Sequence, residues 1–288
     1  MRIGVISDIH VDSYQMWDKI PKLIVETTIN EKADVLVVCG DIATDLRLFD
    51  SFFQYLATAL QKVGIQILFV PGNHDIWVYT PKSPSPTSKE KYYKFIPRVL
   101  KKHDNVHYLP EAPFIKDGHA FVGSMGWYDF SFLDFQQDRS SIMKSLDKRL
   151  DKLWADKKYM WWGDQQVSSF EDNVRILNIM LEELRSQLMR VKNVRDITVC
   201  LHMVPYHEFC LGEKEFDIFA AYMGSDKLFD LIKKFKNAKR ILFGHTHSPW
   251  DEVREGVRFI NASVGLWYQN KGRNIEDYLV ERMKFIDI

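Results

Sequence analysis

Five short polar runs stand out along the chain because their side chains are of the types that bind metal ions. They offer carboxylate, imidazole and amide donors without thiolate, a set of intermediate hardness that suits Mn, Fe, Zn or Ni. The candidate ligands are Asp8, His10, Asp41, Asn73, His202, His245 and His247. These seven are too many for one tetrahedral ion. We therefore expect two divalent transition-metal ions that share a bridging carboxylate and clamp the oxygens of an in-line displacement.

Each polar run directly follows a short apolar segment of strand length. The segments are Ile3–Ser7, Val35–Cys39, Gln66–Val70, Ile197–Leu201 and Ile241–Phe243. In α/β sheets, ligands bind in the crevice outside the carboxyl ends of the strands. The five runs are therefore expected to meet along one rim.

The turn residues agree with this placement. Glycines that permit tight turns precede three of the runs, at Gly40, Gly72 and Gly244. In the pairs Asp8/His10 and His245/His247 the residues are two apart, and alternate residues of an extended segment project to the same side. Both members of each pair are expected to face one metal centre.

The order of the runs, D-x-H, G-D, G-N-H-D, H and G-H-x-H, resembles that of the calcineurin-like metallophosphoesterase superfamily over residues 1–265. The resemblance implies how the ligands are shared. A first ion would be held by Asp8, His10 and His247, and a second ion by Asn73, His202 and His245. Asp41 would bridge the two ions.

By the same resemblance His74 is the catalytic histidine, which binds no metal and protonates the leaving oxygen or stabilises the transition state. Asp75 would orient its ring. The implied enzyme is a phosphodiesterase or phosphatase that hydrolyses an organic phosphate ester by attack of a hydroxide bound to both metals. The Ser/Thr protein-phosphatase branch matches less well, because Ile42-Ala43-Thr44-Asp45 after the second motif lacks that branch's arginine.

The fold that the resemblance implies is a single α/β domain over residues 1–288, a four-layer αββα sandwich of two mixed sheets. Helices near 21–31 and 46–63 would cover a sheet, and the C-terminal part is rich in strands. An insertion over 78–165 would begin at a proline-rich stretch and form a cap beside the metals that governs substrate choice.

Within the expected insertion, short strands are predicted at 106–109, 112–116 and 119–124, and a helix near 136–159. The segment is rich in aromatic residues, namely Trp127, Tyr128, Phe130, Phe132, Phe135, Trp154, Tyr159, Trp161 and Trp162. They either pack the cap or wall a substrate pocket, and the sequence leaves both interpretations open.

A helix over 164–190 carries apolar residues spaced by three and four. We expect it to pack against its own domain, with a homodimer through this helix as the alternative. Asp164 would cap the helix, and Asp45 and Asp129 are likewise interpreted as turn or cap residues. The histidines outside the motifs, His103, His107, His119 and His207, are expected to be structural, although His207 could reach a substrate.

Composition limits the remaining function classes. The 39 acidic and 39 basic residues cancel, so nucleic acid is an unlikely partner, although residues 82–103 hold seven Lys or Arg against Glu90 alone. That stretch is either a solvated helix face or a flank that attracts phosphorylated substrates. A nuclease and a non-catalytic scaffold of the same fold stay as alternatives, and the presence of His74 argues against the scaffold.

The sequence also bears on the compartment. No apolar run reaches the eighteen residues of a membrane span, so no membrane is expected as a partner. Cys39 and Cys200 lie in apolar strand segments, where a reduced thiol is expected. Because cleavage of a signal peptide would remove Asp8 and His10, we expect a cytoplasmic enzyme.

Overall fold

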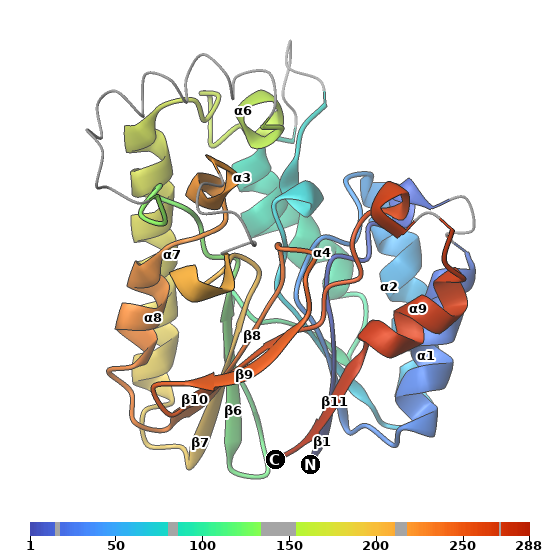
Figure 1. Ribbon diagram of the computed structural model, residues 1–288. Coiled ribbons are helices and arrows are strands. Elements are labelled where there is room, and N and C mark those ends of the chain that lie inside the picture. Colours follow the sequence, from blue (N-terminus) through green and yellow to red (C-terminus); the bar gives the residue numbers. More distant parts are fainter. Residues whose placement is uncertain (15–17, 80–85, 134–153, 211–217, 271) are drawn as a thin grey trace.

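The computed structural model describes residues 1–14, 18–79, 86–133, 154–210, 218–270 and 272–288. Two sheets face each other, and helices cover the outer side of each (Figure 1). The expected four-layer α/β sandwich is confirmed. In the described part of the chain, no helix combines the length and the apolarity needed to cross a bilayer.

The first sheet has five strands in the order β11-β1-β2-β3-β4. They are β11 (Lys284–Asp287), β1 (Arg2–Ile6), β2 (Val35–Val38), β3 (Gln66–Phe69) and β4 (Val106–Tyr108). β1 to β4 run parallel and β11 pairs antiparallel with β1, so the sheet is mixed. Strands buried on both faces read as continuous apolar runs, and all four residues of β2 are buried.

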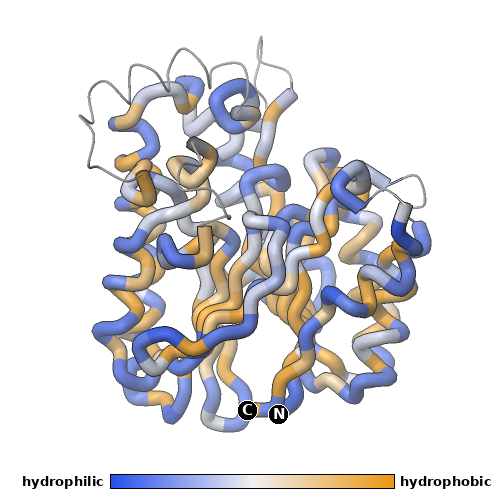
Figure 2. The backbone as a smooth tube through the Cα atoms, viewed as in Figure 1, coloured by the Kyte–Doolittle hydropathy of each residue, from blue (hydrophilic) through white to orange (hydrophobic). Residues whose placement is uncertain are grey.

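The second sheet has six strands in the order β5-β6-β7-β8-β10-β9. They are β5 (Phe114–Lys116), β6 (His119–Ser124), β7 (Asp196–Leu201), β8 (Ala238–Phe243), β10 (Val257–Asn261) and β9 (Trp250–Arg254). The four inner strands are parallel, and the two edge strands are antiparallel. Both sheets contribute to one apolar layer between them, with Val5 and Val37 from the first and Cys200 and Leu242 from the second. Figure 2 shows the central strands of the two sheets largely in the orange of hydrophobic residues.

Helices α1 (Lys19–Asn30), α2 (Leu46–Gln61) and α9 (Ile275–Arg282) lie outside the first sheet (Figure 1). In α2 the apolar residues at helical spacing are buried as expected, whereas Val63 lies beyond the helix end and is exposed. Asp45 caps α2 by accepting hydrogen bonds from the backbone N–H groups of Arg47 and Leu48, as predicted.

Helices α7 (Phe170–Arg190) and α8 (Asp226–Ile232) lie outside the second sheet. The apolar residues Leu177, Leu184 and Leu188 of α7 are fully buried in the chain's own core, which confirms packing against the same domain. The predicted start of this helix was wrong. Ser169, and not Asp164, is the N-cap, because its hydroxyl and the carboxylate of Asp172 form a reciprocal capping box.

The expected insertion over 78–165 is not one excursion. Its middle part supplies β4 to the first sheet and β5 and β6 to the second. β6 pairs with β7 along its whole length, from His119 opposite Asp196 to Ser124 opposite Leu201. Among the described residues of the segment, α3 (Ser88–Glu90) and α6 (Asp156–Tyr159), one in each flank, lie toward the carboxyl ends of the strands, in the upper part of Figure 1. The strands were predicted, but their partners are far away in the sequence, so their place in the core was not.

The first flank contains α3 (Ser88–Glu90), a π-helical turn (η3, Lys91–Phe95) and α4 (Ile96–Leu100), and the second contains α6 (Asp156–Tyr159). Short 3-10 turns complete the chain: η1 (Val11–Ser13), η2 (His74–Ile76), η4 (His207–Phe209), η5 (Ile218–Tyr222) and η6 (Trp267–Asn270). Of the predicted helix over 136–159, residues 136–153 lie outside the described part of the chain.

Most of the aromatic group packs a core. Trp127 and Tyr128 are almost fully buried, and the indole N–H of Trp127 donates to Asn173 Oδ1 of α7 at 2.8 Å. Phe130 and Phe132 are also buried, and Phe135 lies outside the described residues. The interpretation as packing is therefore right for this part of the group. Trp154 differs from these residues, because it lines a cleft.

Candidate metal centre and active site

The predicted ligands meet at the carboxyl ends of β1, β2, β3, β7 and β8, on one rim as expected. Three overlapping groups each have their ligand atoms within 4.8 Å of one another. The groups are Asp8 with His10 and His247, His10 with Asp41 and His74, and Asp41 with His202 and His245. Asn73 joins the last group, since its Oδ1 lies 3.0 Å from His202 Nε2.

Asp41 lies at the middle of the rim. Its Oδ2 is 3.7 Å from His10 Nε2 and 3.5 Å from His202 Nε2, which belong to opposite ligand groups. The same oxygen is 4.0 Å from His74 Nε2. A carboxylate between two ligand groups is the position from which one side chain can contact two ions.

Three histidines are oriented by a hydrogen bond on the ring nitrogen that faces away from the centre. His202 Nδ1 donates to Cys39 O at 2.8 Å, and His245 Nε2 donates to Tyr222 O at 3.2 Å. His247 Nδ1 donates to Gln269 Oε1 at 2.7 Å. An acceptor on one ring nitrogen fixes the tautomer and leaves the other nitrogen's lone pair for a metal. The donor set therefore fits a pair of divalent cations.

His10 is held differently. Its Nε2 faces His247 Nε2 at 3.1 Å, so that both nitrogens could bind one cation. Its Nδ1 is buried and has no hydrogen-bond partner among the described residues. Asp8, the third member of this group, accepts from the backbone N–H of His245 and from Ser263 Oγ at 2.7 Å.

The charges on the rim favour metal binding. Burial acts to raise the pKa of Asp41, but His202 and His74 outweigh it and hold that pKa well below its usual range. Burial lowers the pKa of His10 and of His74 below that of an ordinary histidine. Burial also opposes a charge on His202, yet Asp41 raises the pKa of His202 to about 10. A metal that binds His202 therefore displaces a proton.

The ligand backbone is strained. Five ligand residues have the left-handed backbone conformation, which residues other than glycine rarely adopt. They are Asp8 (φ 53°), His10 (φ 44°), Asp41 (φ 58°), His245 (φ 73°) and His247 (φ 54°). The predicted extended geometry of the two i, i+2 pairs was therefore wrong, although both pairs do face the centre. Such strain persists only where surrounding contacts over-determine it, as they commonly do at functional sites.

Two motif glycines are required by close approach. A Cβ at Gly72 would overlap the Asp41 carboxylate, and a Cβ at Gly244 would overlap Ser7 Oγ and the Asp8 carboxylate. Neither position needs a positive φ. The glycines thus bring the strand-end loops close enough for their ligands to share one centre.

Asp75 does not have the predicted role. Its carboxylate accepts four backbone N–H groups, from Asp41 at 2.9 Å, Ile42 at 2.8 Å, Ala43 at 3.1 Å and Gly72 at 2.8 Å. Among the described residues, no hydrogen bond joins it to the His74 ring. The carboxylate shapes the loop that carries Asp41, and the resemblance could not reveal this because the donors are backbone groups.

His74 is fixed by other contacts. Its backbone N–H donates to Asp41 Oδ1 at 2.9 Å, and its ring lies over the indole of Trp77 with 3.5 Å between centroids. The side chain is 22% exposed, whereas Asp41 and His202 are almost inaccessible. His74 therefore lies at the boundary between the metal ligands and solvent, where a substrate would arrive.

Asp156 is a site residue that the sequence analysis missed. Its buried carboxylate accepts from Asn73 Nδ2 at 2.8 Å, Trp77 Nε1 at 2.5 Å and Trp154 Nε1 at 3.0 Å. The first bond leaves Asn73 Oδ1 directed at the metal centre. No motif marks this aspartate. Asn73 and Trp77 are far from it in the sequence, and a tryptophan two positions before it does not by itself indicate a site. Gln269, which orients His247, was missed for the same reason.

Lys91 is a second missed residue. Its Nζ donates to Trp77 O at 2.6 Å, Thr44 O at 3.1 Å and Asp75 O at 3.5 Å. It thereby ties the loop after β2 to the loop after β3. Burial lowers the pKa of Lys91 to about 8.

A cleft of about 510 Å³ opens directly onto the rim. Its lining includes the predicted site residues Asp41, Asn73, His74, His245 and His247. The rest of the lining is largely apolar and consists of Trp77, Trp154, Ala155, Phe219, Met223, Leu266 and Tyr268, with the polar Thr246 and Gln269. Of the central aromatic group, Trp154 is the member that walls this cleft.

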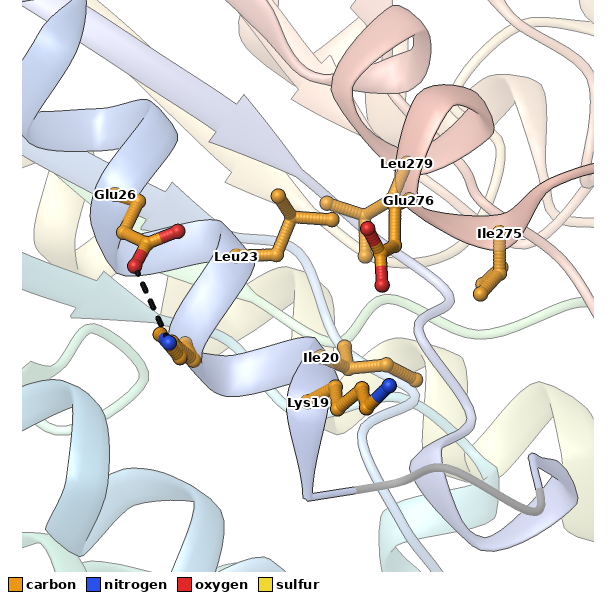
Figure 3. Close-up of a pocket in the computed structure, with 8 residues that line it drawn as sticks. Lys19, Ile20, Leu23, Glu26, Ile275, Glu276 and Leu279 are labelled. Carbon is orange, nitrogen blue, oxygen red and sulfur yellow. Dashed lines mark ion pairs between the residues drawn. The ribbon is translucent and has the colours of Figure 1, made fainter.

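Another hollow, of about 270 Å³, lies between α1 and α9, away from the rim. Figure 3 shows Leu23 of α1 opposite Leu279 of α9, with Lys19 and Glu276 near them. The residues around it include no histidine, and Lys22 pairs with Glu26 on the same helix. This hollow lacks the chemistry of the rim.

The histidines outside the motifs have structural partners. His207 Nδ1 pairs with Asp226 Oδ1 at 3.0 Å, away from the cleft, so the prediction that it could reach a substrate is not supported. His119 bonds Thr198 Oγ1, and His107 bonds Gln66 Oε1, each at 2.8 Å. His103 lies in the turn before β4.

The remaining predicted polar residues also have partners. Asp129 accepts from the backbone N–H of Ser131 at 3.2 Å and pairs with Lys227 at 2.9 Å, as a turn residue would. Within the basic stretch, Lys91 is buried, and other lysines are paired with acids. The pairs are Lys94 with Glu90, Lys101 with Glu111, and Lys102 with Asp50.

The comparisons with known proteins agree with this geometry. The family model for calcineurin-like phosphoesterases matches residues 1–249. The chain belongs to this family. It is a metal-dependent phosphoesterase, and it hydrolyses a phosphate ester.

The chain is 23% identical over 252 residues to the [acyl-carrier-protein] phosphodiesterase PptH of Mycobacterium tuberculosis strain H37Rv, with 85% of this chain and 72% of the relative covered. The crystal structure of the phosphopantetheinyl hydrolase PptH from Mycobacterium tuberculosis superimposes with a TM-score of 0.65 at 19% identity, covering 99% of this chain and 95% of the other. A dimetal phosphatase from Danio rerio gives 0.52 at 14% identity, covering 91% and 86%. At these identities the structures show a shared fold.

Proposed function

We propose that this phosphoesterase is a phosphodiesterase whose two ions, drawn from Mn, Fe, Zn or Ni, are held by the predicted ligands. Asp8, His10 and His247 would hold one ion, and Asn73, His202 and His245 would hold the other. Asp41 would be shared by both. The observation that carries this division is the place of Asp41 Oδ2 within 4 Å of histidines from both groups.

When bound, two such ions supply positive charge that activates a water molecule and offsets the charge on the phosphoryl group. The protein residues do the rest. Asp8 and Asp41, buried and ionised, set the negative charge that the ions neutralise. His74 faces the cleft, and its Nε2 lies near the bridging carboxylate, where it can donate a hydrogen bond to the leaving oxygen. The stack on Trp77 keeps the ring in that orientation.

The charges of the cleft favour a diester. A phosphate monoester carries two charges near neutral pH, and a diester carries one. Among the described residues that line the cleft, none is lysine or arginine. No protein cation there can offset a second charge, and the cleft continues past the rim into space for another ester group. The name of the curated relative adds the phosphodiester of an acyl-carrier protein to the substrates worth testing.

The test compares bis(p-nitrophenyl) phosphate with p-nitrophenyl phosphate after each metal is loaded singly. We expect kcat/KM for the diester to exceed that for the monoester by about tenfold or more, because one charge fewer must be desolvated. A preference for the monoester would overturn the diester assignment. Absence of turnover on both esters, in protein that holds two ions per chain, would favour the non-catalytic scaffold.

A nuclease is the second candidate, and the structure gives it little support. Lys91 is buried, and Lys94, Lys101 and Lys102 are paired with acids. Among the described basic residues of the stretch this leaves Lys89 and Arg98 exposed, which is little charge for a cationic groove. Binding of single-stranded DNA that weakens steeply with salt would reverse this view.

Two further parts of the proposal concern the cell and the assembly. We place the enzyme in the cytoplasm, because Cys39 and Cys200 are buried thiols that form no disulfide. Fractionation of cells tests this. A homodimer through α7 would use the outer face of that helix, since the inner face is packed in the chain's own core. Sedimentation velocity would detect it.

A further inference from the structure

Two indole rings flank the metal ligands at the mouth of the cleft. Trp77 lies under His74, with 3.5 Å between centroids. Trp154 lies edge-on to His245, with 6.2 Å between centroids. Both indole N–H groups donate to Asp156, which directs the polar edges of the rings inward and holds the two side chains relative to each other. The rim therefore opens between two aromatic walls whose positions are fixed.

The wall on the Trp154 side continues away from the metal ligands. Trp154 packs on Tyr222 at 4.7 Å and on Phe219 at 6.0 Å between centroids. Phe219 and Tyr268 also line the cleft and leave 39% and 64% of their surface exposed. Large apolar side chains that gather in one hollow and stay exposed mark a place where a ligand covers them.

The charge of the cleft limits the ligand further. Beyond the predicted metal ligands and His74, the described lining residues carry no charge. Thr246 and Gln269 supply polarity at the rim, and Gln269 is already bonded to His247. A carboxylate or ammonium group in the outer cleft would lose water without gaining a partner of opposite charge, which is unfavourable.

We propose that the outer cleft binds an uncharged, aromatic or otherwise apolar group of the phosphodiester substrate while the phosphoryl group lies at the metal ligands. This inference rests on the proposed function, because it needs the phosphoryl group to be anchored at the rim. Trp154, Phe219 and Tyr268 form the apolar subsite. Its contact with the substrate selects among esters that all react at the same metal centre.

Phosphonates test the subsite, because they are not hydrolysed and carry a single substituent. The dissociation constants of methylphosphonate, benzylphosphonate and 4-carboxybenzylphosphonate are measured by calorimetry on the metal-loaded protein. We expect benzylphosphonate to bind about tenfold more tightly than methylphosphonate, since part of a phenyl ring becomes buried. The added carboxylate should remove most of that gain.

Variants locate the effect. In Phe219→Ala combined with Tyr268→Ala, the ratio of the methyl to the benzyl dissociation constant should fall from about ten to below about three. Tyr55→Ala, an exposed aromatic on α2 outside the cleft, is the matched control and should keep the full ratio. Circular dichroism checks that each variant is folded.

The failures are distinguishable. Equal binding of methyl- and benzylphosphonate, or tighter binding of the carboxybenzyl compound, would overturn the apolar subsite and leave the phosphodiesterase proposal standing. An undiminished ratio in the double variant would place the benzyl group elsewhere and also overturn the subsite. Failure of all three phosphonates to bind, together with no turnover of bis(p-nitrophenyl) phosphate, would overturn the proposed function itself.

Discussion

The metal-ligand rim and the apolar wall of the cleft are adjacent and are built in opposite ways. On the rim, Asp8 and His202 are inaccessible to solvent, and the carboxylates and outer ring nitrogens have hydrogen-bond partners with the exception of His10 Nδ1. On the wall, Phe219 and Tyr268 keep 39% and 64% of their surface exposed to solvent. The difference separates two tasks. The rim must hold its geometry before any ligand arrives, whereas the wall gains its contacts only when a substrate is bound.

The rim is costly to build. Charged ligands such as Asp41 are removed from water, and five ligand residues have a backbone in the left-handed conformation. Asp75, Asp156 and Lys91 compensate through ten hydrogen bonds, seven of them to backbone groups. Changes to the rim should therefore alter metal binding and stability together, and changes to the wall should alter substrate preference alone.

Removal of the metals should have the largest effect. Dialysis against a strong chelator is expected to abolish turnover, and the midpoint of thermal unfolding should also fall, because Asp8 and Asp41 are left as buried carboxylates without the ions. Added Mn²⁺ should restore both. Full activity in protein shown by mass spectrometry to be free of metal would contradict the dinuclear assignment.

Asp75→Ala should be the most destabilising single change, by about 3 kcal/mol or more in urea unfolding, because four backbone N–H groups lose their acceptor in a buried place. Asp45→Ala is the matched control, since it removes a partly exposed helix cap and should cost about 1 kcal/mol. Equal losses in the two variants would show that Asp75 is not the support of the Asp41 loop.

Asp156→Ala should weaken the affinity for one of the two ions by roughly 10–100-fold, because Asn73 loses the partner that directs its oxygen. Titration of the metal-free protein with Mn²⁺ measures this. The exposed Asp164→Ala in the same region is the control. If both ions bind Asp156→Ala as tightly as wild type, Asp156 of α6 does not support the metal centre.

Lys91 should give the smallest effect, visible as a dependence of stability on pH. Burial lowers the pKa of Lys91 to about 8 in the folded protein, below the 10.5 of a free lysine. Between these values the unfolded chain binds more protons than the folded one, so this residue's contribution to stability rises with pH. The unfolding free energy of wild type minus that of Lys91→Met should therefore increase from about pH 8 to about pH 10. A flat difference for Lys91→Met would contradict it, and the exposed Lys94→Met is measured in parallel as the control.

Much of the site was predictable because each ligand stands in a short motif beside its own strand. Asp8, Asp41 and Asn73 lie within four residues of the ends of β1, β2 and β3, so the local sequence was enough to predict them. The supports were not predictable in this way. Asp156 and Gln269 act on residues more than eighty or about twenty positions away, through contacts that only the folded chain creates.

The fold shows the same division. The strands over 106–124 were predicted from their local pattern, but their membership of the two sheets depends on β3 and β7, which are distant in the sequence. The start of α7 was misplaced because Asp164 after a glycine has the local form of a cap, while Ser169 gains its role from a reciprocal bond with Asp172. Asp75 was predicted to orient the ring of its sequence neighbour His74. Its carboxylate instead accepts hydrogen bonds from backbone N–H groups, such as that of Asp41.

The central claim is that Asp41 bridges the ions whereas His74, although within reach of the same centre, binds none. The most direct test counts metal ions per chain by mass spectrometry in Asp41→Asn and His74→Asn and measures turnover of bis(p-nitrophenyl) phosphate on the same samples. We expect His74→Asn to keep the wild-type metal content and to lose about 10²–10⁴-fold in kcat, and Asp41→Asn to lose metal and activity together. His74→Asn protein depleted of metal, or Asp41→Asn protein that keeps both ions, would contradict the claim.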